Sequence, residues 1–103
     1  MIRPEEFTGN FLLESVTIPE SVKHIGEHAF ANCKNLSEVI ISDNVFNIDC
    51  GAFSNCESLG EIFIPNSVTN IGADAFYGCK KLISIHWSES LEQINYEAFE
   101  NCV

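Results

Sequence analysis

Basic residues are scarce in this chain, and long apolar runs are absent. Only 5 of the 103 residues are Lys or Arg, against 15 Asp and Glu, which gives a formal net charge of −10 at pH 7. A chain this acidic repels a phosphate backbone, so the sequence argues against nucleic acid as a partner. No apolar run approaches the roughly 18 residues of a membrane span, and the N-terminal stretch lacks the regions of a secretory signal. We therefore predict neither membrane insertion nor a signal peptide.

Motifs for catalysis and for metal binding are also missing. The sequence contains no Cys-x-x-Cys, no Cys/His cluster at zinc-ligand spacing and no glycine-rich phosphate loop. No nucleophile, base and orienting group recur in a motif, so we predict that the chain is not an enzyme and needs no cofactor or metal. His24 and His28 are four residues apart. A predicted corner at Gly26 separates them, which favours two solvated histidines over a metal pair.

What the sequence does contain is a repeat of 23 residues. Residues that recur at this spacing form a column of equivalent positions, and one such column is apolar: Leu13, Leu36, Leu59 and Leu82. An Ala-Phe pair begins at positions 29, 52, 75 and 98, and a Cys stands at 33, 56, 79 and 102. We interpret the chain as a single repeat domain, a fragment of a longer array. Its parts are a partial repeat at 1–12, full repeats at 13–35, 36–58 and 59–81, and a near-complete repeat at 82–103.

Each repeat predicts a short strand followed by a return leg. In the stretch SVTIP the apolar residues alternate, so Val16 and Ile18 should point into the core. Turn residues follow, and the segment EHAFANC should form a helical turn. Two columns hold residue types that tolerate positive φ, so we predict left-handed corners there. These columns are Gly26, Asp49, Gly72 and Asn95, and Gly9, Asn32, Asn55, Gly78 and Asn101.

Stacking is the way in which units this small bury an apolar face, so the repeats predict a solenoid. The pattern L-x-x-[VI]-x-I-[PS]-x-[SN]-V-x-x-I-G-x-x-A-F-x-[NG]-C-x-x-L resembles the BspA-like, or Treponema-type, leucine-rich repeat and covers the whole chain. The resemblance implies a leucine-rich-repeat solenoid of right-handed coils of about 23 residues. A parallel β-sheet should form one face, with short helical turns on the return leg.

The repeated cysteines should form a ladder along the stack. Asn10 stands in the same column and cannot form half of a disulfide, so we favour buried thiols that bond to open backbone groups at the coil corner. The predicted ladder consists of Asn10, Cys33, Cys56, Cys79 and Cys102. Cys50 lies outside this column and is predicted to be the thiol that reacts.

Outward strand positions of successive repeats should line up as an extended face. The predicted face consists of Thr17, Ile40, Phe63 and His86, flanked by Glu38 and Glu61. Ile40 and Phe63 are apolar although they point outward. They indicate either a protein interface or strand residues that support their cross-strand neighbours.

The resemblance implies a function, because BspA-like relatives act as adhesins toward host matrix proteins or other cells. The resemblance implies a surface-exposed or secreted protein of a bacterium or parasitic protist. We predict a non-enzymatic recognition module of a cell-surface or secreted adhesin, with a protein ligand such as a host extracellular-matrix or cell-surface protein. The alternatives are a structural spacer, an element that self-associates end to end, and an intracellular scaffold.

Overall fold

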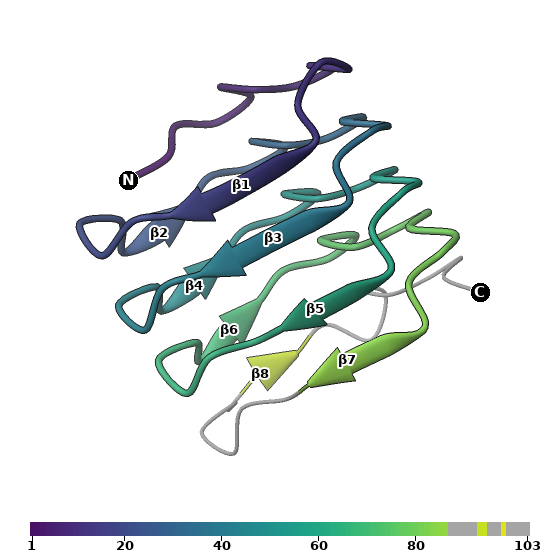
Figure 1. Cartoon of the computed structure of the whole chain (residues 1–103). Coiled ribbons are helices and arrows are strands. Elements are labelled where there is room, and N and C mark those ends of the chain that lie inside the picture. The colour runs from purple at the N-terminus through teal and green to yellow at the C-terminus, as the bar shows by residue number, and fades with distance from the viewer. Residues whose placement is uncertain (87–92, 95–97, 99–103) are drawn as a thin grey trace.

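The chain winds into a stack of coils, and each coil adds a strand to both of two rows (Figure 1). The computed structural model describes residues 1–86, 93–94 and 98. One row holds the longer strands β1 (Ser15–Ile18), β3 (Glu38–Ile41), β5 (Glu61–Phe63) and β7 (Ser84–His86). The other row holds β2 (His24–Ile25), β4 (Asn47–Ile48), β6 (Asn70–Ile71) and β8 (Gln93–Ile94).

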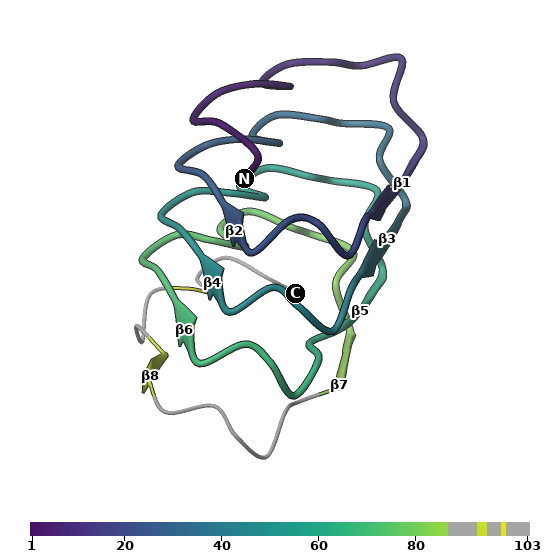
Figure 2. The ribbon, with the colours of Figure 1, turned by 90° about the vertical axis from the view of Figure 1, so that its left-hand side faces the viewer.

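All strand pairs are parallel, and the pairing register equals the sequence period. β1 pairs with β3 so that Ser15 lies opposite Glu38, and β5 pairs with β7 so that Phe63 lies opposite His86. β3 and β5 are in contact between these pairs, while β2, β4, β6 and β8 form one four-stranded sheet. Figure 2 shows that the two rows occupy different sides of the stack. This parallel arrangement confirms the predicted leucine-rich-repeat solenoid.

The return leg consists of separate turns, so the helical turns predicted there do not form in the described residues. The N–H of Ala29 donates to the carbonyl of Gly26 in the same coil at 3.1 Å, whereas the N–H of Phe30 donates to Ala52 in the next coil at 2.7 Å. Because alternate amides bond to the neighbouring coil, they are not available for the continuous ladder of an α-helix. In the described part of the chain, no helix long and apolar enough to cross a membrane is found.

Left-handed residues occur in one of the two predicted columns. Positive φ is found as expected in Gly9, Asn32, Asn55 and Gly78. The prediction for the column that begins at Gly26 is wrong, because the left-handed residues stand two positions later. They are Glu5, His28, Gly51 and Asp74. The last member of each predicted column, Asn95 and Asn101, lies outside the described residues.

Close approach of the coils, and not φ, accounts for glycine at positions 26 and 72. A Cβ on Gly26 would lie 2.6 Å from the carbonyl oxygen of Ile2, and one on Gly72 would lie 2.7 Å from the backbone nitrogen of Cys50. Backbone atoms cannot move aside as a flexible side chain can. Asp49 keeps a side chain in the same column, and its carboxylate accepts a hydrogen bond from the N–H of Cys50 at 2.8 Å.

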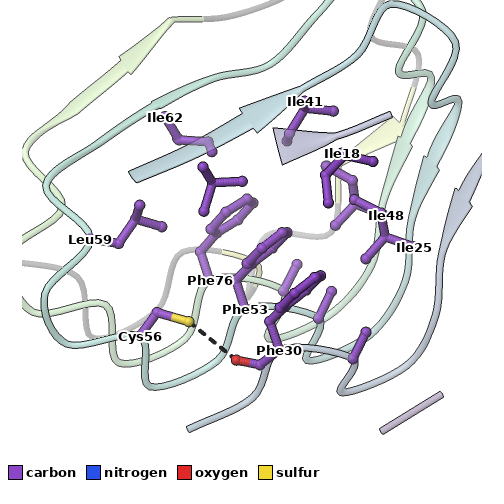
Figure 3. Close-up of a cluster of buried hydrophobic side chains, with 14 of the residues drawn as sticks. Ile18, Ile25, Phe30, Ile41, Ile48, Phe53, Cys56, Leu59, Ile62 and Phe76 are labelled. Atoms are coloured by element: carbon purple, nitrogen blue, oxygen red, sulfur yellow. Dashed lines mark hydrogen bonds between the residues drawn. The ribbon is translucent and has the colours of Figure 1, made fainter. Parts of the chain in front are cut away.

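The core lies between the two rows of strands and the return leg (Figure 3). A stack of phenylalanine rings runs through it, with ring centroids 5.1 Å apart for Phe7 and Phe30, 5.2 Å for Phe30 and Phe53, and 5.4 Å for Phe53 and Phe76. The last three rings are fully buried. The ring spacing is close to the roughly 4.8 Å between neighbouring strands, so one ring per coil fills the core continuously.

Candidate recognition surface on the sheet

Four outward residues of the longer strands form the surface that we call the sheet-face column. Alternation along each strand turns these side chains away from the core. Parallel pairing places Thr17 beside Ile40 and Phe63 beside His86, and β3 and β5 are in contact between these pairs. The column consists of Thr17, Ile40, Phe63 and His86, all of them exposed. Ile40 is 53% exposed and Phe63 is 56% exposed. Two large apolar side chains on contacting strands are therefore open to solvent.

An aromatic pair stiffens one end of the sheet-face column. The rings of Phe63 and His86 are parallel within 8°, with centroids 4.1 Å apart. The Nε2 atom of His86 lies 3.0 Å from Oε2 of Glu61 and 3.1 Å from Oγ of Ser84. These contacts hold the imidazole against the phenyl ring. The result is a flat aromatic platform, with a carboxylate at its edge.

The group of Ser84, His86 and Glu61 has the residue types of a catalytic triad but not its geometry. A triad needs one imidazole nitrogen for the nucleophile and the other for the carboxylate, so that a proton can be taken up while the carboxylate orients the ring. Here both partners contact the same atom, Nε2. With Nε2 contacted by both groups, His86 is not placed to take a proton from Ser84 at one nitrogen while Glu61 orients the ring at the other.

Two glutamates flank the sheet-face column, and the longer strands contain no Lys or Arg. Glu38 and Glu61 are exposed, and Glu38 takes part in none of the ion pairs found among the described residues. The basic residues of the chain all stand outside the longer strands. They are Arg3, Lys23, Lys34, Lys80 and Lys81.

The thiols of the cysteine column point at backbone oxygens of the preceding coil. The hydrogen bonds run from Cys33 to the carbonyl of Phe7 at 3.2 Å, from Cys56 to Phe30 at 3.3 Å and from Cys79 to Phe53 at 3.2 Å. Figure 3 shows the bond of Cys56. All three thiols are buried. Asn10 begins the column, and its side-chain oxygen accepts a hydrogen bond from the N–H of Leu12 at 3.1 Å. Cys102 lies outside the described residues.

Burial favours the protonated form of the thiols of Cys33 and Cys56. Desolvation raises the pKa of Cys33 and of Cys56 above the ordinary value of 9.0. The neighbouring thiols Cys79 and Cys33 raise the pKa of Cys56 further. A neutral thiol is a poor nucleophile, which suits a structural role for these two residues. Cys50 is half-buried and free, and its preferential reactivity stays a prediction.

The two histidines that sequence spacing brings together have separate surroundings. His24 lies in β2, with Nδ1 3.0 Å from the side-chain amide nitrogen of Asn47. The side chain of Asn70 continues this polar ladder by donating to Asn47. His28 stands at a left-handed corner, over Gly51 of the next coil. No three His, Cys, Asp or Glu residues in the described ranges are grouped as metal ligands.

The polar ladder on the second sheet was missed by sequence reasoning. Its signal was a column of polar residues at the same 23-residue period, His24, Asn47, Asn70 and Gln93. The exposed ring of Phe46 lies beside it, tilted against His24 with centroids 6.2 Å apart. Of this column, only His24 was considered from the sequence, as a possible metal ligand.

Comparison with known proteins finds several bacterial leucine-rich repeat proteins that are similar to this chain. A leucine-rich repeat protein of T. pallidum has 35% sequence identity to it, with a TM-score of 0.95 over 98% of this chain and 47% of the other. A leucine-rich cell surface protein of Faecalibacterium prausnitzii has 38% identity, with a TM-score of 0.95 over 98% of this chain and 27% of the other. The pneumococcal vaccine antigen PcpA has 34% identity, with a TM-score of 0.76 over 86% of this chain and 22% of the other.

The chain thus spans about half of the T. pallidum protein and about a quarter of the F. prausnitzii protein. No curated protein sequence gives a significant match. The family model described as the BspA type leucine rich repeat region (6 copies) matches residues 1–103. With its repeat pattern, its parallel coils and these likenesses, the chain belongs to the BspA-type leucine-rich repeat family.

Proposed function

We propose that this chain is a non-enzymatic protein-recognition module of a cell-surface or secreted adhesin that binds host or matrix proteins. The observation that carries the proposal is the pair of exposed apolar side chains, Ile40 and Phe63, on contacting strands of one sheet face. The relatives support the location, since one is described as a cell surface protein and another as a pneumococcal vaccine antigen.

The sheet face suits recognition because it is already ordered before a ligand arrives. Parallel pairing holds the backbone, and the stack of Phe63 on His86 restrains two of the exposed side chains. A preordered surface loses little conformational entropy on binding, so more of the contact energy appears as affinity. Aromatic and aliphatic side chains surrounded by polar residues are also the usual composition of the centre of a protein interface.

Binding to immobilised fibronectin, laminin and collagen, measured by biolayer interferometry, tests the proposal. We expect saturable binding to at least one of these proteins. The double variant Ile40→Glu/Phe63→Glu should lose it, because two carboxylates replace the apolar centre of the surface. Phe46→Glu is the matched control, since Phe46 is 48% exposed but lies beside the other sheet. Circular dichroism of each variant shows whether the fold is kept.

Two outcomes would contradict the proposal. One is no saturable binding to any of the three proteins or to an extract of host cell-surface proteins. The other is binding that survives the double variant. Sedimentation across a range of concentrations would then separate a self-associating element, whose mass rises, from a spacer or scaffold, whose mass stays constant.

A further inference from the structure

Each of the two central strands, β3 and β5, carries one acidic and one apolar side chain on its outward side. Glu38 precedes Ile40 by two residues on β3, and Glu61 precedes Phe63 by two residues on β5. Side chains two apart on a strand point to the same side, about 7 Å from each other. The face therefore has an apolar half next to an acidic half, each contributed by two neighbouring strands.

No side chain of this face neutralises the acidic half fully. Glu61 contacts His86, whereas Glu38 is in none of the ion pairs of the described residues, and no Lys or Arg stands in the longer strands. Like charges on adjacent strands repel each other. A cation brought by a partner would relieve this repulsion at Glu38, which takes part in no ion pair of residues 1–86.

We infer that the sheet face selects a basic partner, namely a protein segment in which an arginine stands close to an apolar residue. The apolar residue would cover Ile40 and Phe63, and the guanidinium would bond to the carboxylates of Glu38 and Glu61. Arginine fits better than lysine because its planar fork pairs with carboxylates and stacks on aromatic rings. This inference rests on the proposed function, because it names the ligand class of the same surface.

A second copy of this chain fits the surface poorly. Another sheet face would bring the same two glutamates and no arginine, and the whole chain carries a formal charge of −10. Repulsion between like-charged surfaces opposes such a pairing. Charge complementarity therefore favours a foreign, basic segment over self-association through this face.

Selection from a random dodecapeptide phage library on the immobilised chain tests the inference. Selection is run in parallel on the intact chain, on Glu38→Gln/Glu61→Gln, on Phe63→Glu and on the control Phe46→Glu. Glutamine keeps the size of glutamate and one acceptor oxygen, but it removes the charge and has an amide donor in place of the second oxygen. We expect the intact chain and the control to enrich peptides with an arginine near an apolar residue. Both sheet-face variants should lose this enrichment.

Selected peptides are then synthesised together with counterparts in which the arginine is replaced by glutamine. We expect the arginine peptides to bind the intact chain at least about fivefold more tightly, which is the scale of one or two exposed ion pairs. The difference should shrink as salt is raised, because screening weakens exposed ion pairs.

The outcomes separate the inference from the proposed function. Peptides that need Phe63 but show no arginine enrichment and bind Glu38→Gln/Glu61→Gln equally well would overturn the inference and leave the recognition surface standing. Selection that yields no Phe63-dependent peptides would count against both. Arginine peptides that bind equally to all variants would place the binding elsewhere and also overturn the inference.

Discussion

At the scale of single residues, the distance between coils limits which side chains are possible. Glycine at positions 26 and 72 faces backbone atoms of the preceding coil at distances where a Cβ does not fit. His28 and Gly51 show a related constraint, because a Cβ on Gly51 would overlap the imidazole of His28. At such positions the neighbouring coil, as well as the residue's own backbone conformation, restricts which side chain can be accommodated.

Gly72→Ala is expected to lower the free energy of unfolding by about 1–3 kcal/mol, because the new methyl group forces the backbone near Cys50 to move. Gly60→Ala is the matched control. The nearest atom to a Cβ there is the carbonyl oxygen of Lys81 at 3.6 Å, an ordinary contact. The control should be neutral or slightly stabilising. Urea unfolding followed by circular dichroism measures both, and equal effects would refute the close-approach explanation.

At the scale of structural elements, the return leg and the strands are held together by ladders that repeat once per coil. The phenylalanine stack and the cysteine column are two of these ladders. Each member is buried by the coils on either side, so its contribution depends on both neighbours. Interior members should therefore matter more than equivalent residues on the surface.

Phe53→Ala is expected to cost about 3–5 kcal/mol of stability, because it leaves a cavity in the middle of the ring stack. Phe63→Ala removes a ring of the same size from the surface, and it should cost less than about 1 kcal/mol. Phe53→Leu should cause a smaller loss of stability, and it replaces Phe53→Ala in the comparison if the alanine variant does not fold. Thermal and urea unfolding provide the comparison. A larger effect at Phe63 than at Phe53 would contradict the assignment of the core.

The cysteine ladder predicts a loss of stability at alkaline pH. The folded state raises the pKa of Cys33 and Cys56 above 9.0, so above about pH 9 the unfolded chain releases protons that the folded chain keeps. Stability is therefore unaffected by these thiols below pH 9 and falls as pH rises further. The slope is up to about 1.4 kcal/mol per pH unit for each thiol.

Urea unfolding under reducing conditions at several pH values measures this slope. Cys56→Ser keeps a donor for the carbonyl of Phe30 but does not titrate in this range, so its stability should fall less steeply with pH. Cys50→Ser controls for the loss of a cysteine outside the ladder. If Cys56→Ser and the intact chain follow the same slope, the explanation fails.

At the scale of the whole molecule, charge works against folding at neutral pH. The formal charge is −10, and the described residues contain three ion pairs, two of which depend on a histidine being protonated. Most carboxylates of the described residues thus take part in no ion pair. Folding brings them closer together than they are in the extended chain, so self-repulsion destabilises the compact state.

Added salt should therefore stabilise the chain. Raising ionic strength from about 0.01 M to about 0.5 M shortens the screening length from about 30 Å to a few Å, and we expect a gain on the order of 1 kcal/mol. Urea unfolding in NaCl and in KCl measures the effect. Equal gains in the two salts would identify screening as the cause, whereas no gain in either would show that self-repulsion is negligible.

The sequence predicted the solenoid closely because its evidence is local and repeated. Alternation in SVTIP is enough to predict a strand, and the 23-residue period is enough to predict its partner. The backbone conformation at the coil corners was harder to predict. Asn32 and Asn55 were predicted correctly as left-handed, but glycine at 26 and 72 was explained by φ when the cause was the neighbouring coil. A sequence column cannot separate these two reasons for glycine.

By itself, the sequence determined the coil length and the residues that fill the core. Only the tertiary structure decided which amides bond within a coil and which bond to the next, and so why turns form in place of a helix. It also decided that Phe63 stacks on His86 beside Glu61. The physical reason is that these contacts join atoms of neighbouring coils, whose side-chain rotamers and spacing are set only when the coils stack.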